Sequence, residues 1–253
     1  MSDPAGTPAR NPGAAPGSAS TPRRLTAATF LGDNTVEPMR RLVNDLSHRG
    51  LDVELQHLGD RSTPNALAKA ADVDLLWMCG GLVVEQQAAG ALAHDVVAAP
   101  VFTDQPGPVY HSVIVARHDG PKTTAEALGG PVAINEPQSW SGHRALRRHL
   151  SPIWFATEMI SGSHRESLAA VAEGRALCAG IDHSIWTATP EPSLVVIDRT
   201  TDWPAPPVLI RRGLPAATVE TITAALIEFT DDGVDRTVDR FVPAETSDYE
   251  VMG

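Results

Sequence analysis

Short segments that combine hydroxyl, imidazole and glycine residues in this sequence suit the binding of an anion. Residues 135–143 read NEPQSWSGH, in which Ser139 and Ser141 stand at the start of an expected helix. The first turn of a helix has backbone N–H groups without carbonyl partners, and these bind phosphate, phosphonate or carboxylate. Serine hydroxyls add donors, and Gly142 lets the backbone approach a ligand closely. Ordinary helix capping by serine is the alternative that this motif leaves open.

Two later segments also place polar side chains directly before an expected helix. Residues 161–164 (SGSH) place Ser163 and His164 before another expected helix. The sequence predicts that both serine turns follow strands of a parallel sheet, and open α/β sheets bind ligands at the carboxyl ends of their strands. Residues 179–183 (AGIDH) place Asp182 at the end of an apolar strand, where a charge is costly unless it is paired. Asp182 therefore either accepts hydrogen bonds from a ligand or caps the next helix.

Strand and helix signals alternate along the chain and position these segments. Apolar runs closed by glycine or polar residues indicate buried strands, and apolar residues at helical spacing indicate helices. Strands are expected at residues 25–31, 52–58, 73–79, 96–102, 109–118, 131–136, 176–182, 193–199 and 206–212. Helices are expected at residues 36–48, 64–71, 85–92, 141–150, 167–172, 184–186 and 216–229. The repeated βα units predict an α/β fold with parallel sheets.

Proline-rich stretches at residues 103–108 and 204–207 interrupt this alternation. Turn residues of this kind punctuate a chain, and we interpret them as crossings between two lobes. Lobe I is expected to combine residues 23–108 with 201–253, and lobe II to comprise residues 109–200. The closing segment of the chain would then complete the first lobe.

Residues 1–22 are rich in Pro, Gly, Ala and Ser and have no apolar core, so we expect a disordered tail. They show neither the apolar region of a secretory signal nor a lipoprotein cysteine, which predicts a cytoplasmic protein unless an export signal was removed. No apolar stretch approaches the ~20 residues that span a bilayer, so we expect no membrane span.

The net charge of the chain indicates which partners it does not suit. The 31 acidic and 20 basic residues give a net charge of −11. Such a surface is unsuited to phosphate backbones, and we expect no nucleic-acid partner. Cys79 and Cys178 lie in apolar runs and are interpreted as buried free thiols, since two cysteines form neither a disulfide framework nor a zinc pair.

Four histidines fall on segments expected around a cleft. Their separations are irregular and no metal-binding pattern accompanies them, so we expect them to bind a ligand or cap helices. We therefore expect no metal and no cofactor. They are His111, His143, His164 and His183.

Familiar catalytic motifs are missing from the sequence. It has no nucleophile elbow, P-loop or dinucleotide fingerprint. Ser141 and His164 are residue types that hydrolases use, but nothing in the sequence orients the histidine as a base. Catalytic residues stay unassigned, and we expect binding rather than chemistry.

The order of these motifs resembles a family of binding proteins. The runs GPVYHSVIVARHDG, NEPQSWSGH and SGSHRESLAAVAEGRALCAGIDHSIW are similar to the phosphonate/phosphate-type (PhnD-like) solute-binding proteins of ABC importers. The resemblance covers roughly residues 73–207. It implies a type II periplasmic-binding-protein fold, in which two lobes joined by a two-strand hinge close on a small ligand. The family is usually periplasmic or extracytoplasmic.

The resemblance also implies a set of ligand-binding residues. The serine turns match the family's anion-holding helix start and its second cap loop, and Asp182 matches an acidic residue that faces the ligand's polar end. Tyr110 matches an aromatic just past the first crossing, whereas His143 replaces the family's usual tyrosine. The full set is Cys79, Gly80, Tyr110, Ser139, Ser141, Gly142, His143, Ser163, His164 and Asp182.

We therefore expect a solute-binding protein that closes on a small anionic ligand, phosphate-like or phosphonate-like, for ABC-type uptake. Its partners would be that ligand and the permease of the importer. A cytosolic enzyme on the same fold, acting on a small anionic metabolite in a biosynthetic pathway, is the alternative, because fold alone does not decide function. A ligand-sensing regulatory protein is the third hypothesis.

Overall fold

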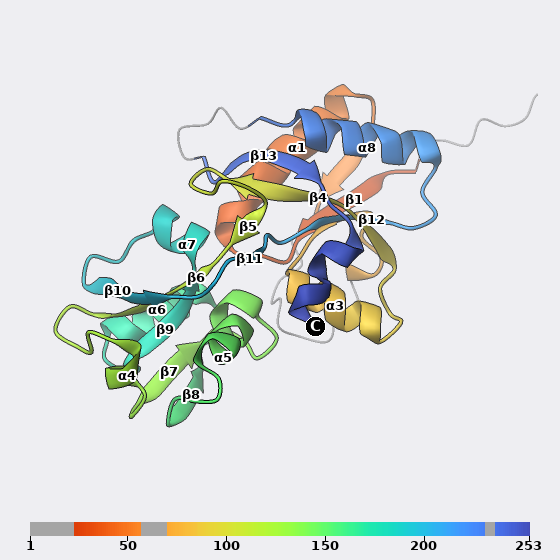
Figure 1. Ribbon diagram of the computed structural model, residues 1–253. Coiled ribbons are helices and arrows are strands. Elements are labelled where there is room, and N and C mark those ends of the chain that lie inside the picture. The colour runs from red at the N-terminus through yellow and green to blue at the C-terminus, as the bar shows by residue number, and fades with distance from the viewer. Residues whose placement is uncertain (1–22, 57–69, 231–235) are drawn as a thin grey trace, which may run out of the picture.

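The computed structural model describes residues 23–56, 70–230 and 236–253. In it the chain forms two α/β lobes that are joined by a narrow two-stranded ribbon (Figure 1). The predicted tail, residues 1–22, and most of the predicted helix at residues 64–71 lie outside the described residues.

The larger lobe contains a sheet in the strand order β13-β4-β12-β3-β1-β2. β1 is parallel to β2 and β3, whereas β12 is antiparallel to β3 and β4. The sequence predicted a parallel sheet, whereas this sheet is mixed. The reason is that β12 returns from the other lobe and starts beside the end of β3. Its strands are β1 (Leu25–Thr29), β2 (Val53–Leu55), β3 (Leu75–Trp77), β4 (His94–Phe102), β12 (Val208–Arg211) and β13 (Val238–Pro243).

The smaller lobe contains a sheet in the order β10-β6-β9-β7-β8. β7 is parallel to both β8 and β9, and β6 is antiparallel to β9 and β10. β8 is the strand expected before the second serine turn. The sequence did not predict its bounds, because its side chains are mostly exposed and show no apolar alternation. The strands are β6 (Ser112–Arg117), β7 (Pro131–Ile134), β8 (Thr157–Ile160), β9 (Cys178–Asp182) and β10 (Leu194–Arg199).

The two crossings between the lobes pair with each other. β5 (Val109–Tyr110) and β11 (Trp203–Pro204) form an antiparallel ribbon, in which Tyr110 lies opposite Trp203. The Ala205 N–H donates to the Pro108 carbonyl at 2.9 Å and extends the pairing. This ribbon is the two-strand hinge that the resemblance implied. The division of the chain into lobes at residues 108/109 and 200/201 stays a prediction.

The helices cover the sheets, and α1 lies beside α8 on the larger lobe (Figure 1). α1 has the predicted bounds and buries Met39, Leu42 and Leu46, whereas Ile227 on α8 is 39% exposed. The helices are α1 (Val36–His48), α3 (Gly80–Ala88), α4 (Thr124–Ala127), α5 (Ala145–Leu150), α6 (His164–Ala172), α7 (His183–Ala188) and α8 (Ala216–Glu228). η1 (Asp33–Thr35) and η3 (Thr246–Met252) are 3₁₀ helices, and η2 (Trp140–Arg144) is a short π-helix.

The helix predicted at residues 85–92 was placed too late. α3 begins at Gly80, directly after Cys79. The glycines that follow the predicted strand at residues 73–79 belong to this helix, where they allow close packing. A Cβ atom on Gly80 would lie 2.7 Å from the Tyr249 ring, and one on Gly81 would lie 2.9 Å from the Trp140 ring.

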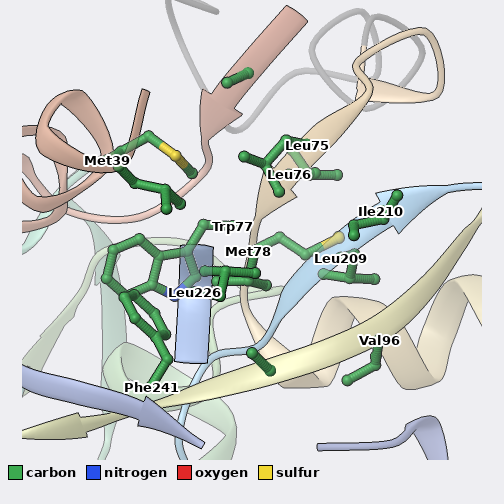
Figure 2. Packing of buried hydrophobic residues seen from close by; sticks show 14 of the residues in the cluster. Met39, Leu75, Leu76, Trp77, Met78, Val96, Leu209, Ile210, Leu226 and Phe241 are labelled. Atoms are coloured by element: carbon green, nitrogen blue, oxygen red, sulfur yellow. The ribbon is translucent and has the colours of Figure 1, made fainter. Parts of the chain in front are cut away.

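The core of the larger lobe also fixes the second crossing. Trp77 is fully buried, contacts Phe241 edge to face, and is surrounded by Met39, Leu209 and other apolar residues (Figure 2). Its Nε1–H donates to the Pro206 carbonyl at 2.8 Å. The Tyr249 hydroxyl donates to the neighbouring Ala205 carbonyl at 2.7 Å. The chain that returns from the smaller lobe is therefore anchored in this core.

A buried carboxylate ties the outer end of this sheet together. Asp74 is fully buried and accepts hydrogen bonds from Arg23, Arg211 and the Thr26 N–H. Burial alone would raise the pKa of Asp74, but the Thr26 amide and the two guanidinium groups outweigh it and lower that pKa. The carboxylate is therefore ionised and paired at neutral pH.

Replacing this carboxylate tests the arrangement. We expect Asp74→Asn to lower the free energy of unfolding by about 2 kcal/mol, because it leaves the half-buried Arg211 without its counterion. The stabilisation is fully present above the unfolded pKa of about 4, so denaturant titration at pH 7 measures all of it. Asp52→Asn is the control, since its pair with Arg24 is exposed and is expected to contribute under about 0.5 kcal/mol. Equal effects of the two variants would contradict the proposed role of Asp74.

Candidate ligand-binding site

A cavity of about 780 Å³ lies between the lobes and is lined by residues from both. On the smaller lobe its wall includes the turns that follow β7, β8 and β9. β7 is parallel to its two neighbours in the sheet, so the carboxyl ends of these strands meet at one edge. η2, α6 and α7 begin at that edge. Of the predicted site residues, the cavity wall includes Cys79, Tyr110, Ser139, Ser141, Ser163, His164 and Asp182.

Ser139 and Ser163 cap the helical turns that begin beside the cavity. Ser139 Oγ accepts a hydrogen bond from the Gly142 N–H at 3.1 Å, and Ser163 Oγ accepts one from the Glu166 N–H at 3.1 Å. A hydroxyl that accepts in this way keeps its own proton as a donor. Capping and ligand binding, which the sequence left as alternatives, are therefore compatible here.

The two serine turns converge through a direct contact. Ser141 Oγ lies 3.1 Å from His164 Nε2. The backbone supports this contact, because the Gly162 N–H donates to the Asn135 carbonyl at 2.8 Å. Segments that are more than 20 residues apart in the sequence thus present hydroxyl and imidazole groups to one cavity.

His164 is a neutral partner in this contact. Burial lowers the pKa of His164 to about 4, so the ring carries no charge near pH 7. A backbone hydrogen bond to Gly180 acts in the opposite direction and is outweighed by burial. A general base of a Ser/His hydrolase needs a pKa near neutrality. The lowered pKa of His164 therefore gives no support to the hydrolase alternative.

Asp182 caps the next helix, which is one of the two alternatives that the sequence left open, and its place in the cavity wall is compatible with the other. It is the N-cap of α7, and its Oδ1 accepts from the Ser184 N–H at 2.9 Å and from the Ser184 hydroxyl at 2.7 Å. It also lines the cavity. Burial raises the pKa of Asp182, and the hydrogen bonds from Ser184 only partly offset this effect. A ligand group that donates to this carboxylate would lower its pKa again.

The hinge and the larger lobe contribute Tyr110 and Cys79. Burial, followed by the nearby Cys79 and Asp182, raises the pKa of Tyr110 well above its ordinary value. Burial also raises the pKa of the Cys79 thiol. Both groups are therefore protonated at neutral pH, the phenol as a hydrogen-bond donor and the thiol as a weak one.

Three predicted residues lie outside the cavity wall. The His143 ring points elsewhere: its Nδ1 lies 2.9 Å from the Pro137 carbonyl and its Nε2 lies 3.3 Å from Glu158. Two residues after Ser141, it falls on the opposite side of the helical turn. Gly142 instead makes room for Asn135, since a Cβ atom there would lie 1.7 Å from Asn135 Oδ1. Gly80 packs under Tyr249, as described above.

The sequence reasoning missed most of the larger lobe's share of the wall. Phe30, Leu31 and Asn34 follow β1, Leu82 lies on α3, and Phe102 ends β4. The rule that placed the serine turns, that ligands bind beyond the carboxyl ends of strands, applies equally to the end of β1.

The lobes already touch around the cavity. Asn34 Nδ2 donates to Ser184 Oγ at 3.0 Å, and an exposed ion pair joins Asp33 to Arg165 at 3.4 Å. Near the hinge, His183 Nδ1 lies 3.0 Å from Asp104 Oδ2. The structure therefore shows the lobes close together.

The histidines do not form a metal site. His111 stacks on His183 with ring centroids 4.2 Å apart, and burial lowers the pKa of His111 to about 4. His164 lines the cavity and His143 lies on the outer side. Within residues 23–56, 70–230 and 236–253, no group of three or more His, Cys, Asp or Glu is arranged to hold a metal ion.

Two lobes on a two-stranded hinge, with a cavity between them, define the architecture of a bilobed solute-binding protein. Comparison with known families gives the same result, since residues 26–249 match the model of the ABC transporter, phosphonate, periplasmic substrate-binding proteins. The chain belongs to this family, which confirms the predicted family and the predicted solute-binding role. No curated protein matches the sequence.

Solved structures share the fold. The binding protein component of a Pseudomonas aeruginosa ABC phosphonate transporter is 16% identical, with a TM-score of 0.68 over 90% of this chain and 84% of its own. PhnD1 from Prochlorococcus marinus, in complex with methylphosphonate, is 15% identical, with a TM-score of 0.73 over 92% and 96%. An ancestral arginine-binding protein bound to arginine is 14% identical, with a TM-score of 0.55 over 81% and 92%. At these identities the likeness shows the two-lobed fold alone, as predicted.

The pKa of His164 gives a test of its burial. Between pH 6.5 and 4 the unfolded chain binds a proton at His164 that the folded chain does not, so stability falls as the pH falls through this range. We expect His164 to lower the free energy of unfolding by on the order of 2 kcal/mol between pH 7.5 and 5. The His164→Gln variant should not show this loss. Denaturant titration of both proteins at the two pH values measures it, and His118→Gln on an exposed turn is the control. Parallel pH profiles of wild type and His164→Gln would show that the ring is solvated.

Proposed function

We propose that this chain binds a small phosphonate-like or phosphate-like anion in the cavity between its lobes and delivers it to the permease of an ABC importer. Its family is periplasmic, and we place the chain outside the cytoplasmic membrane rather than in the cytosol as first predicted. Among the described residues, no helix is both long enough and apolar enough to cross a bilayer.

The observation that carries this proposal is the meeting of the serine turns at one wall of the cavity. Ser139 and Ser163 each cap a turn and keep a hydroxyl proton, and Ser141 lies within hydrogen-bond distance of His164. Tetrahedral anions accept several such bonds at once, and helix starts add partial positive charge. Neutral hydroxyls and amides, rather than lysine or arginine, would hold the anion.

The charged residues of the wall favour a ligand that also carries a donor. Arg165 lines the cavity but is paired with Asp33 on the other lobe. Asp182, by contrast, places a carboxylate beside the anion-binding turns. An ammonium or hydroxyl group on the ligand would pair with it, and the phenol of Tyr110 would donate from the hinge. We propose a zwitterionic or hydroxylated phosphonate as the ligand that satisfies both sets of groups.

Serine and aspartate variants test the two halves of this proposal. Ser141→Ala removes a hydrogen bond to a charged group, so we expect the Kd for methylphosphonate to rise about 10-fold to 100-fold. Asp182→Asn should weaken an aminoalkylphosphonate by a similar factor but methylphosphonate by much less. Isothermal titration calorimetry measures both, with ligand-induced thermal stabilisation as a second readout.

The control is Ser47→Ala, whose hydroxyl donates to the Val43 carbonyl on α1 far from the cavity. If Ser141→Ala and Asp182→Asn both bind like Ser47→Ala, the site is elsewhere. If the bound phosphonate is consumed during incubation, the protein is an enzyme, and the binding-only proposal is wrong.

A further inference from the structure

The cavity has its stated volume although the two lobes are already in contact around it. Asn34 is hydrogen-bonded to Ser184 across the opening, and His183 approaches Asp104 beside the hinge. A Cβ atom on Gly32 would lie 2.7 Å from the Ile185 side chain, so backbone of one lobe is packed against a side chain of the other. Further closure therefore cannot remove much of the space.

This space is far larger than a simple phosphonate. An anion of five heavy atoms fills the volume of about three or four waters, roughly 100 Å³ at about 30 Å³ each. The cavity of about 780 Å³ lies within the range of sites that enclose drug-sized ligands, about 300 to 1,000 Å³. Around a small anion alone, most of this space would be occupied by water.

The walls of this space differ in character. The hydroxyl groups gather on the smaller lobe, at the turns of residues 139–141 and 161–164. The larger lobe contributes the polar residues Asp33, Asn34 and Thr35 and, besides these, an apolar surface. This apolar surface, called the apolar wall below, is formed by Phe30, Leu31, Leu82, Phe102 and Pro206. Water against such a wall is poorly hydrogen-bonded, and an apolar group that displaces it gains free energy.

We propose that the ligand carries an apolar body of at least the size of a benzene ring on its phosphonate or phosphate head. The head binds the serine turns, and the body packs against the apolar wall of the larger lobe. The proposal rests on the proposed function, because it assumes an anionic head. It adds an aryl or longer alkyl body to that ligand and leaves the donor group proposed for Asp182 in place.

A series of matched compounds tests this proposal by calorimetry. Methylphosphonate supplies the head alone, phenylphosphonate adds a ring, and phenyl phosphate joins the same ring through an ester oxygen. Burial of about 100 Å² of additional apolar surface at about 25 cal/mol per Å² predicts that the phenyl compounds bind roughly 50-fold more tightly than methylphosphonate. The ratio of the two phenyl Kd values distinguishes phosphonates from phosphate esters as the source of the head.

A variant that fills part of the cavity tests where the apolar body of the ligand binds. Leu82→Trp occupies space on the apolar wall, so we expect it to reduce the 50-fold ratio to about 5-fold or less. Leu51→Trp is the matched control, since Leu51 is also partly buried against the larger core but does not line the cavity, and it should leave the ratio unchanged.

The outcomes separate this inference from the function on which it rests. Equal Kd values for methylphosphonate and phenylphosphonate, or tighter binding of methylphosphonate, overturn the inference while the anion-binding function stands. A ratio that Leu82→Trp leaves unchanged also overturns it, because the ring then lies elsewhere. If none of the three compounds binds, the proposed function itself fails.

Discussion

The helix starts beside the cavity cannot satisfy their own first amide groups, and the smaller lobe is organised around this constraint. Ser139, Ser163 and Asp182 stand at the N-caps of the turns that follow β7, β8 and β9, and each accepts one amide hydrogen bond. A cap satisfies part of a first turn, and the other amides depend on solvent or a ligand. Because β7 runs parallel to both of its neighbours, these unsatisfied ends gather at one edge.

The larger lobe contributes an apolar wall to the cavity, whereas the smaller lobe contributes hydrogen-bond donors. Its core holds the second crossing through Trp77 and Tyr249, which donate to the carbonyls of Pro206 and Ala205. The same neighbourhood contributes Pro206 and Phe102 to the apolar wall. The position of this wall opposite the serine turns is therefore set by the core of the larger lobe, through its packing and these two hydrogen bonds. A change in the core of the larger lobe would act on the cavity through this crossing.

How far the sequence predicted the site depends on how local each signal is. Ser139, Ser141 and Ser163 were found because a cap and its helix are adjacent in the chain. Phe30 and Leu82 were missed because an apolar residue that lines a cavity has the same pattern as one in the core. The glycines after Cys79 were misinterpreted since glycine marks both turns and close packing. The fold and family were predicted, whereas the inward direction assumed for His143 depended on a helical phase that the sequence did not specify.

In the proposed function, electrostatics would decide which anions this cleft accepts. Asp182 already has a raised pKa from burial, and an anion bound nearby would raise it further. A ligand without a cationic or donor group would therefore bind more weakly while Asp182 is ionised, which couples its binding to the protonation of this carboxylate. A ligand that carries an ammonium or hydroxyl group would supply a partner for the carboxylate and avoid this coupling. On this proposal, the carboxylate would select among anions that the serine turns alone would bind alike.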